Sequence, residues 1–447
     1  MNTLLEQTTF GERSQLLELR RPAAVDLFCG AGGMGLGFEQ AGFDIVAAVE
    51  IDPIHCATHE FNFPYCPVIC GDIRNVTAET LRSKSGLNET PVDVVFGGPP
   101  CQGFSMIGKR ADNDPRNDLI MEFLRLASSL SPKYIVMENV KGLTLGKQQR
   151  YLDEIVAGFA RVGFRPLLPW RVLNALDFGV PQERERLFLI AANEDLPLPE
   201  YPLPLTCRSR IDNPLFEMRC TPSVIEAIGD LPNADDFEEL EHSDSVKVEY
   251  GDASEYALVL RGVIDDPCDC SYPRSYDPET LTSSLRTNHT PESRRRFAEA
   301  RHGCAESVSR FLKLDPDGFC NTLRAGTASD RGAFTSPRPI HPVHPRCITV
   351  REAARLHSYP DWFRFHTTKW HGARQIGNSV PPLLARAVAS SIIRALNIEP
   401  GKPTLSLPAS DEALLRMNMQ DACLYYGIPF DTIPRRTRNS ERERKDR

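Results

Sequence analysis

The sequence has little of what marks membrane, secreted or zinc-binding proteins. It contains no run of about 18 apolar residues, the length that spans a bilayer as a helix. Its first 19 residues are polar and lack the apolar core of a signal peptide, so we expect a cytoplasmic protein, or a nuclear one in a eukaryote. The 13 cysteines are odd in number and include no Cys-x-x-Cys pair. Reduced thiols and the absence of a metal site are therefore expected.

Net positive charge is also lacking, because the formal charge is −8 at pH 7. The charge is unevenly spread: residues 200–270 hold 17 acidic and 5 basic residues, whereas residues 281–355 hold 7 acidic and 13 basic ones. Twelve of those 13 are arginine, the side chain suited to bidentate contacts with phosphate and guanine. On charge alone, a nucleic-acid surface and a solvated face without a partner are about equally supported.

The first 195 residues alternate buried-strand and helix patterns, which is typical of an α/β fold with a parallel sheet. Strands are predicted at residues 23–28, 45–49, 92–96, 134–137 and 186–191, with a further one ending near Asp72. Polar candidates follow these strands at their carboxyl ends. Because ligands of open α/β sheets bind outside those ends, this edge is the predicted site.

The rest of the chain divides by composition. Prolines cluster at 197–204, and acidic and then arginine-rich sequence follows, which indicates an inserted second domain of loops and short strands. The α/β pattern resumes near Ile348 and ends with an apolar helix at 383–396. The predicted parts are an N-terminal extension (1–21), a main domain (22–195 with 346–400), an inserted domain (196–345), and a C-terminal extension (401–447) with a weak helix around 411–423 and a disordered end.

A glycine-rich turn follows the first strand. Gly30-x-Gly32-x-x-Gly35 matches the dinucleotide fingerprint, and Glu50 lies 20 residues after Gly30, where a ribose-binding carboxylate belongs. A second acid, Asp72, ends the third strand. These residues predict a cofactor that contains a nucleoside, and they do not separate NAD from S-adenosylmethionine.

Cys101 lies in the run Gly98-Pro99-Pro100-Cys101-Gln102-Gly103, directly after a predicted buried strand. The proline pair fixes φ and removes two N–H donors, so the loop stays rigid and outside the sheet. A free cysteine is often a buried structural residue. A thiol held in this loop at the ligand-binding edge is instead predicted to take part in chemistry.

Five segments, in this order, resemble the DNA (cytosine-5)-methyltransferases of restriction–modification type: 26–33 (DLFCGAGG), 99–102 (PPCQ), 138–140 (ENV), 182–186 (QERER) and 374–382 (RQIGNSVPP). The resemblance covers about residues 22–195 and 340–396. It implies a Rossmann-like methyltransferase sheet with an inserted target-recognition domain, and S-adenosylmethionine as cofactor. It also implies double-stranded DNA as substrate, a cognate restriction endonuclease as a possible functional partner, and a monomer in a bacterial or archaeal cell, associated with the nucleoid.

The resemblance also assigns roles around the cofactor. It implies that Glu50 binds the ribose and that Asp72 with Ile73 binds the adenine. The remaining positions that it implies for the cofactor pocket are Phe28, Gly30, Gly32, Gly33, Ile51, Pro100, Asn378, Ser379 and Val380.

The implied reaction explains the catalytic residues. Carbon 5 of cytosine is a poor nucleophile, and a thiolate added to carbon 6 turns the ring into an enamine that can accept a methyl group. Cys101 is the implied nucleophile, and Glu138 the acid that stabilises charge at N3. Arg186 and Arg184 are expected to contact the base carbonyl or a phosphate, with surface ion pairs to Glu183 or Glu185 as the alternative. Asn139 is expected to fix the loop.

The target base must leave the helix, because carbon 6 is inaccessible in a stacked duplex. Residues 105–117 are expected to form a lid, with Lys109, Arg110 and Arg116 near DNA, or else a plain surface loop. The arginine-rich part of the inserted domain is expected to face DNA, and the acidic stretch 233–269 to face away. The DNA-binding residues expected from these arguments are Gln102, Ser105, Lys109, Arg110, Arg286 and Arg324, with Arg294, Arg295, Arg296 and Arg331 in the same arginine-rich part.

Three alternatives remain open on the sequence. The nearest is a tRNA cytosine-5 methyltransferase, although the long variable region and the loose match at Cys347-Ile348-Thr349 disfavour it. A catalytically silent DNA-binding partner is disfavoured by the presence of Cys101, Glu138 and Arg186. A nicotinamide oxidoreductase rests on the glycine fingerprint alone.

Overall fold

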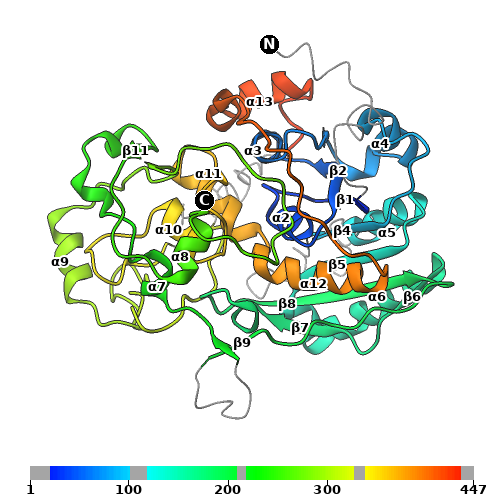
Figure 1. Ribbon diagram of the computed structural model, residues 1–447, viewed down its shortest axis with the longest axis horizontal. Coiled ribbons are helices and arrows are strands. Elements are labelled where there is room, and N and C mark those ends of the chain that lie inside the picture. The colour runs from blue at the N-terminus through cyan, green and yellow to red at the C-terminus, as the bar shows by residue number, and fades with distance from the viewer. Residues whose placement is uncertain (1–20, 101–117, 209–217, 327–337, 434–447) are drawn as a thin grey trace, which may run out of the picture.

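The computed structural model describes residues 21–100, 118–208, 218–326 and 338–433 (Figure 1). Within these residues the central sheet has the strand order β3-β2-β1-β4-β5-β8-β6, with β7 paired to β8. Its strands are β1 (Ala23–Leu27), β2 (Asp44–Glu50), β3 (Val68–Cys70), β4 (Val94–Gly97), β5 (Tyr134–Val140), β6 (Phe164–Pro166), β7 (Arg171–Asn174) and β8 (Glu185–Asn193). The predicted strands are therefore present within a few residues of their expected bounds.

Helices cover both faces of the sheet, because alternate strand residues point to opposite sides. Phe96 and Val136 belong to one buried cluster, together with helices α2 (Gly33–Gln40) and α12 (Pro382–Ala395). Val95 and Ile135 belong to a second cluster on the other face. The helices of that face are α4 (Ala78–Ser85), α5 (Asp118–Ser129) and α6 (Gln149–Arg161).

The expectation of a parallel sheet is correct for β3 to β5 and wrong beyond them. Strands β1, β2, β3, β4 and β5 pair in parallel, whereas β8 is antiparallel to β5, β6 and β7. A buried apolar run does not reveal its direction. Here the chain passes through β6 and β7 before it reverses into β8. Strand β8 therefore runs beside β5 in the opposite direction.

The middle of the chain contains loops and short elements, as expected. They include β9 (Thr206–Cys207), β10 (Arg219–Cys220), α7 (Val224–Ile228), β11 (Val246–Lys247), α8 (Glu255–Leu260), β12 (Thr280–Leu281) and α9 (Pro291–Glu299). This region shares its core with the sheet, because Val224, Leu281 and Leu314 belong to the same buried cluster as Phe96. The domain limits at 195 and 345 stay a prediction.

The chain then returns to the sheet through α10 (Val350–Arg355), α11 (Lys369–Asn378) and α12. Helix α12 crosses α2 so closely that a Cβ at Gly37 would lie 2.4 Å from the Cβ of Ala385. Residues 401–433 continue past the sheet into a short 3₁₀ helix, η9 (Glu412–Arg416), and α13 (Met419–Tyr426) (Figure 1). The weak helix expected near 411–423 is thus two shorter elements.

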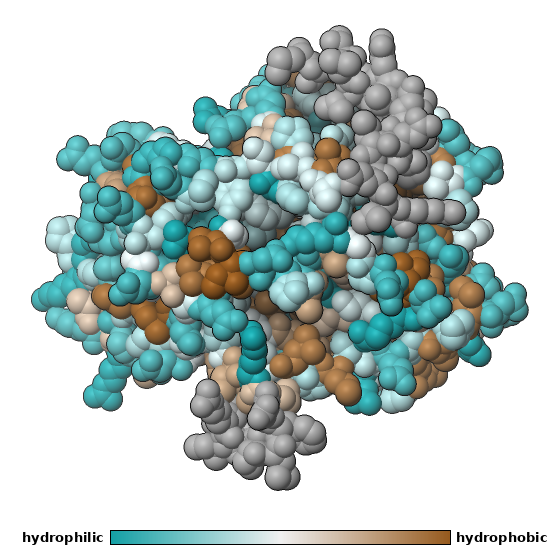
Figure 2. Space-filling model, viewed as in Figure 1, coloured by the Kyte–Doolittle hydropathy of each residue, from teal (hydrophilic) through white to brown (hydrophobic). Residues whose placement is uncertain are grey.

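None of the helices in the described ranges has both the length and the apolar character needed to cross a bilayer. The face of the molecule shown in Figure 2 is mostly hydrophilic and carries separate apolar patches.

Candidate active site at the carboxyl edge of the sheet

The parallel strands bring the predicted site residues to one edge. Strands β3, β2, β1, β4 and β5 are consecutive neighbours in the sheet. They end in turn at Cys70, Glu50, Leu27, Gly97 and Val140. Parallel strands end on the same side, so the residues that follow them share one edge, as the sequence predicts.

Glu50 is held in place by backbone amides. Its Oε2 accepts a hydrogen bond from the Gly30 N–H at 2.9 Å, and its Oε1 accepts from the N–H groups of Ile51 and Asp52, each at 2.9 Å. Phe28, directly before the glycine turn, has a φ of 64°, in the left-handed region that a bulky residue rarely adopts. Both residues are half-buried. The carboxylate is thereby fixed against the glycine turn.

The glycines of the turn serve two different purposes. A Cβ placed on Gly30, or on Gly71 directly after β3, would meet no atom of the described residues within 4 Å. At Gly33 a Cβ would lie 2.2 Å from the Tyr359 hydroxyl, and at Gly32 2.4 Å from the Phe63 ring. Gly32 and Gly33 therefore make room for protein side chains, whereas open space at Gly30 and Gly71 leaves room for a ligand between Glu50 and the end of β3.

Asp72 begins a short 3₁₀ turn, η1 (Ile73–Asn75), at the end of β3. Its Oδ1 accepts a hydrogen bond from the Arg74 N–H at 3.0 Å, and its carboxylate pairs with the Arg74 guanidinium at 2.6 Å. Ile73 is buried beside it. Asp72 and Ile73 thus lie next to the open space at Gly71, just after β3, whose last residue pairs with Glu50.

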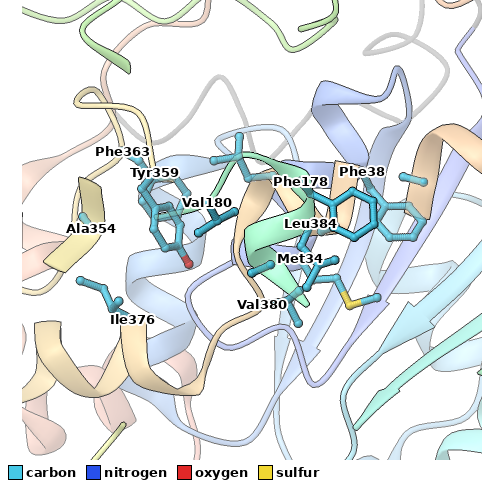
Figure 3. Packing of buried hydrophobic residues seen from close by; sticks show 14 of the residues in the cluster. Met34, Phe38, Phe178, Val180, Ala354, Tyr359, Phe363, Ile376, Val380 and Leu384 are labelled. Carbon is cyan, nitrogen blue, oxygen red and sulfur yellow. The ribbon is translucent and has the colours of Figure 1, made fainter. Parts of the chain in front are cut away.

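The C-terminal part of the chain returns to the glycine turn at the end of α11. A Cβ on Gly33 would lie 2.8 Å from both the Ser379 Cβ and the Val380 carbonyl oxygen. Val380 shares a buried cluster with Met34 and Leu384 (Figure 3). Asn378 is exposed beside them. Ser379 and Val380 therefore contact the glycine turn, and the expected contact of residues 378–380 with a cofactor stays a prediction.

A buried ion pair lies beside the proline loop. The Arg186 Nε is 2.8 Å from the Glu138 Oε1, and both side chains are nearly buried. Burial raises the pKa of the Glu138 carboxyl, and the nearby guanidinium groups of Arg186 and Arg184 oppose that shift. The antiparallel pairing of β5 with β8 brings the two side chains together. The alternative of surface ion pairs with Glu183 or Glu185 is wrong for Arg186.

Asn139 ties the proline loop to β5. Its side-chain amide donates a hydrogen bond to the Pro99 carbonyl at 3.1 Å, and its Oδ1 accepts from the Val140 N–H. A Cβ at Gly98 would lie 2.7 Å from the Glu138 carboxylate, so the loop passes directly over that group. Asn139 fixes the loop, as expected, and half-buried Pro100 continues it toward Cys101.

Arg184 lies in neither of the expected environments, a contact with the base or a phosphate and a surface ion pair. Its guanidinium is fully buried and donates hydrogen bonds to the carbonyl oxygens of Leu323, Gly377 and Ser379 at 2.7–2.8 Å. A side chain engaged in this way joins three segments of the chain from a fully buried position. We therefore treat Arg184 as a residue that positions the site.

Part of the arginine-rich segment pairs with the acidic stretch, so the two stretches do not lie on separate faces as expected; that the segment faces DNA stays a prediction. Arg286 pairs with Glu241 at 2.6 Å and Arg294 pairs with Asp235 at 2.6 Å, so acidic and basic parts face each other. Arg324 is exposed. Three further arginines of this segment, Arg346, Arg351 and Arg355, are buried beside carboxylates.

The sequence did not predict a buried polar network that links Gln182, His357 and Ser379. Gln182 hydrogen-bonds the Leu356 carbonyl and the His357 Nδ1, and its Oε1 accepts from the Leu323 N–H. His357 Nε2 lies 3.1 Å from the Ser379 hydroxyl. Burial keeps the pKa of His357 well below its ordinary value. Gln182 could have been noticed because it begins the QERER segment. The sequence around His357 gives no sign of its role in the network.

Several predicted residues lie outside the described residues, namely Cys101, Gln102, Ser105, Lys109, Arg110, Arg116, Arg331 and the proposed lid at 105–117. Within the described ranges no group of three or more His, Cys, Asp or Glu side chains could hold a metal ion.

Comparison with known proteins gives consistent matches. The family model for the C-5 cytosine-specific DNA methylases matches residues 23–394. The chain is 55% identical over 424 residues to the type II methyltransferase M.XorII of Xanthomonas oryzae pv. oryzae. The alignment covers 95% of this chain and 97% of that protein. It is 33% identical to the type II methyltransferase M.DdeI of Desulfomicrobium norvegicum, which covers 82% of this chain and 88% of that protein.

Solved structures show the same architecture. A crystal structure of a DNA modification methyltransferase encoded within an E. coli prophage aligns with a TM-score of 0.68 and 32% identity, over 84% of this chain and 100% of that one. The Dnmt2 methyltransferase of S. pombe aligns with a TM-score of 0.51 and 19% identity, over 85% of this chain and 100% of that one. The second likeness concerns the fold alone.

Proposed function

The chain belongs to the C-5 cytosine-specific DNA methylases, and on this premise we propose the residues and steps by which it acts. It is a DNA (cytosine-5)-methyltransferase whose methyl donor is S-adenosylmethionine. We propose that it modifies one cytosine in a specific duplex sequence, as a type II enzyme whose methylation protects DNA from a cognate endonuclease. The arrangement that carries this proposal is the Glu138–Arg186 pair under the proline loop that leads into Cys101.

Covalent catalysis begins at Cys101. Its thiolate would add to carbon 6 of the flipped cytosine, and the electron pair of the 5,6 double bond then serves carbon 5 as a nucleophile. Bound S-adenosylmethionine supplies the electrophilic methyl group. Loss of the proton from carbon 5 and departure of the Cys101 sulfur restore the double bond, so the thiolate is regenerated.

Glu138 would act at N3 of the same ring. Negative charge moves toward N3 as the thiolate adds, and a protonated carboxyl can donate a hydrogen bond or a proton there. Burial supports this role because it raises the pKa of Glu138, while Arg186 keeps the side chain oriented. Arg184 would act indirectly, by holding residues 377–379 against the site.

The open space along the edge fits a nucleoside cofactor. Glu50 has two oxygens fixed by backbone amides, with remaining lone pairs for ribose hydroxyls. Asp72 and Ile73 lie beside the space at Gly71 and suit an adenine. Phe28, Gly30, Ile51, Pro100, Asn378, Ser379 and Val380 complete the proposed pocket, in which Gly32 and Gly33 let the turn pack against Phe63 and Tyr359.

Replacing Glu50 with alanine tests the ribose role. Loss of hydrogen bonds to a charged acceptor is expected to raise the dissociation constant for S-adenosylmethionine at least about tenfold. Titration calorimetry with the intact protein measures the change. Glu89→Ala, which removes an exposed carboxylate, is the matched control and should bind as the unchanged protein does. Equal affinity of Glu50→Ala and the control would refute the assignment.

Sequence recognition is proposed to involve the middle region, 196–345. Among its described arginines, Arg324 is exposed next to the segment that packs on Gly377, where a Cβ would lie 2.3 Å from the Ala325 nitrogen. Arg324 is therefore better placed than Arg286, whose guanidinium is bound by Glu241. Gln102, Ser105, Lys109 and Arg110 remain proposed DNA contacts on the sequence alone.

The substrate class is tested by methyl transfer from labelled S-adenosylmethionine to unmethylated duplex DNA and, separately, to tRNA. Digestion to nucleosides should place the label in 5-methyldeoxycytidine, and sequencing of the modified sites should give one short recognition sequence. Label confined to RNA would contradict the proposed substrate and favour the tRNA alternative. Methylation of cytosines without any sequence preference would contradict the type II assignment.

A further inference from the structure

The C-terminal segment, residues 401–426, follows α12 and ends with α13, which lies beside the helix that follows β2 (Figure 1). Leu407 forms a short bridge with the middle region: its carbonyl accepts from the Ser275 N–H at 2.9 Å and its N–H donates to the Pro273 carbonyl at 2.8 Å. Lys402 forms an ion pair with Asp265. The first part of the C-terminal segment is thus bound to the middle region of the chain.

The second part packs against α3 (Pro53–Asn62), the helix that follows β2. Buried Leu414 and Leu415 form a small cluster with Ala57 and Phe61 of that helix, and Tyr426 packs against it. Polar contacts reinforce the cluster. The hydroxyls of Tyr425 and Tyr426 each donate to a different oxygen of Glu60 on α3, both at 2.7 Å.

The same part also binds the segment that leads into α11. The Thr367 N–H donates to the Leu415 carbonyl at 3.0 Å. The His366 Nε2 lies 3.0 Å from the Met417 carbonyl oxygen. Because His366 and Thr367 directly precede α11, residues 412–417 contact both α3 and the start of α11.

These two helices carry proposed cofactor residues at their other ends. Helix α3 begins at Pro53, directly after the turn Glu50-Ile51-Asp52, and the Cys56 thiol on its second turn lies 3.5 Å from the Glu50 carbonyl. Helix α11 ends at Asn378, next to Ser379 and Val380. Gln375 joins the helices, since its amide donates to the Thr58 hydroxyl at 2.8 Å. A shift of α3 relative to α11 would therefore move both sides of the proposed pocket.

We propose that residues 401–426 form a C-terminal strap that positions α3 and α11, and with them the cofactor-binding residues Glu50 and Asn378. The strap acts through these helices and touches neither cofactor nor base. This proposal rests on the proposed cofactor pocket. The strap is part of the packed structure, because Leu414, Leu415, Ala422 and Cys423 are buried.

The strap lies outside the part of the chain that the family model matches. That model ends at residue 394, before the strap begins.

Leu415→Ala in the full chain tests the strap, with Leu424→Ala as the matched control. Both changes truncate a leucine in the strap, but Leu415 is fully buried and Leu424 is 65% exposed. Leu415→Ala is expected to raise the dissociation constant for S-adenosylmethionine roughly tenfold and to leave kcat at saturating cofactor within about twofold. Leu415→Met should restore affinity, because it conserves volume. Leu424→Ala should bind normally.

If the strap only stabilises the fold, Leu415→Ala should lower the melting temperature and the amount of active protein. The affinity of the folded fraction for S-adenosylmethionine should then be unchanged. That outcome would overturn the proposal. If Leu415→Ala does not fold, Glu60→Gln is the variant to measure. It weakens the hydrogen bonds from Tyr425 and Tyr426 while preserving the shape of the side chain. An affinity of Glu60→Gln for S-adenosylmethionine equal to that of the unchanged protein would also overturn the proposal. Failure of the unchanged protein to bind S-adenosylmethionine would refute the proposed pocket instead.

Discussion

Cys101→Ser is expected to abolish methyl transfer to duplex DNA, with a loss on the order of 10⁴-fold or more. A serine hydroxyl ionises far less readily than a thiol near neutral pH, so it cannot add to carbon 6 at a useful rate. Binding of S-adenosylmethionine should stay within about twofold of normal, because the proposed pocket is built from Glu50, Asp72 and the end of α11 rather than from the thiol.

The comparison variant is Cys304→Ser, which replaces an exposed free cysteine in the middle region. It should transfer methyl groups at the normal rate. Label incorporation measured under single-turnover conditions separates the chemical step from product release. Methyl transfer by Cys101→Ser at the rate of Cys304→Ser would remove Cys101 from the mechanism.

Glu138→Gln is expected to lower kcat by about 10²- to 10⁴-fold, the usual range for loss of a general acid. The amide cannot protonate N3, and it leaves Arg186 buried without its counter-charge. Cofactor affinity should change little, because Glu138 lies on β5 whereas Glu50 ends β2, and two strands lie between them in the sheet. Glu185→Gln is the control, since that neighbouring carboxylate is exposed and pairs with Lys141.

The pH dependence of kcat provides a second test of Glu138. Burial raises the pKa of its carboxyl, so the protonated form persists to higher pH than in an exposed glutamic acid. The wild-type kcat should therefore fall as pH rises through this raised pKa. Glu138→Gln should lack that decline, and an identical decline in the variant would assign it to another group.

The edge of the sheet was predictable because its residues follow local patterns. Buried apolar runs located β1, β2, β4 and β5, and their order placed Glu50 and Glu138 at one edge. Asn139 was correctly expected to fix the proline loop, and that expectation came from the family resemblance of the ENV segment. The strands themselves need only periodicity and spacing, both of which are properties of short segments.

Long-range partners were not predictable in the same way. Arg286 and Arg294 look like a basic surface in the sequence, but Glu241 and Asp235 lie opposite them in the fold. Arg184 lies next to carboxylates in the chain, yet it binds carbonyls from residues 323, 377 and 379. Charge counts along a chain do not show which charges neutralise one another, and only the folded arrangement does.

The C-terminal segment shows the same limit. Leu414, Leu415 and Tyr426 form no extended amphipathic pattern, because the segment is split between a 3₁₀ turn and a short helix. Their burial depends on α3, more than 350 residues earlier in the sequence. Packing against a distant helix leaves no local signature, so the sequence predicted only a weak helix in this segment and not the contacts that bury it.

The most direct test of the account is to trap the covalent intermediate on a duplex that carries 5-fluorocytosine at the methylated position. Fluorine cannot leave as the carbon-5 proton does, so the Cys101 sulfur should stay bonded to carbon 6 after methyl transfer. Mass spectrometry of the digested complex should then find the methylated base on the peptide that contains Cys101, and only when S-adenosylmethionine is present. Attachment to another residue, or methylation of normal DNA without any trapped complex, would contradict the proposed mechanism.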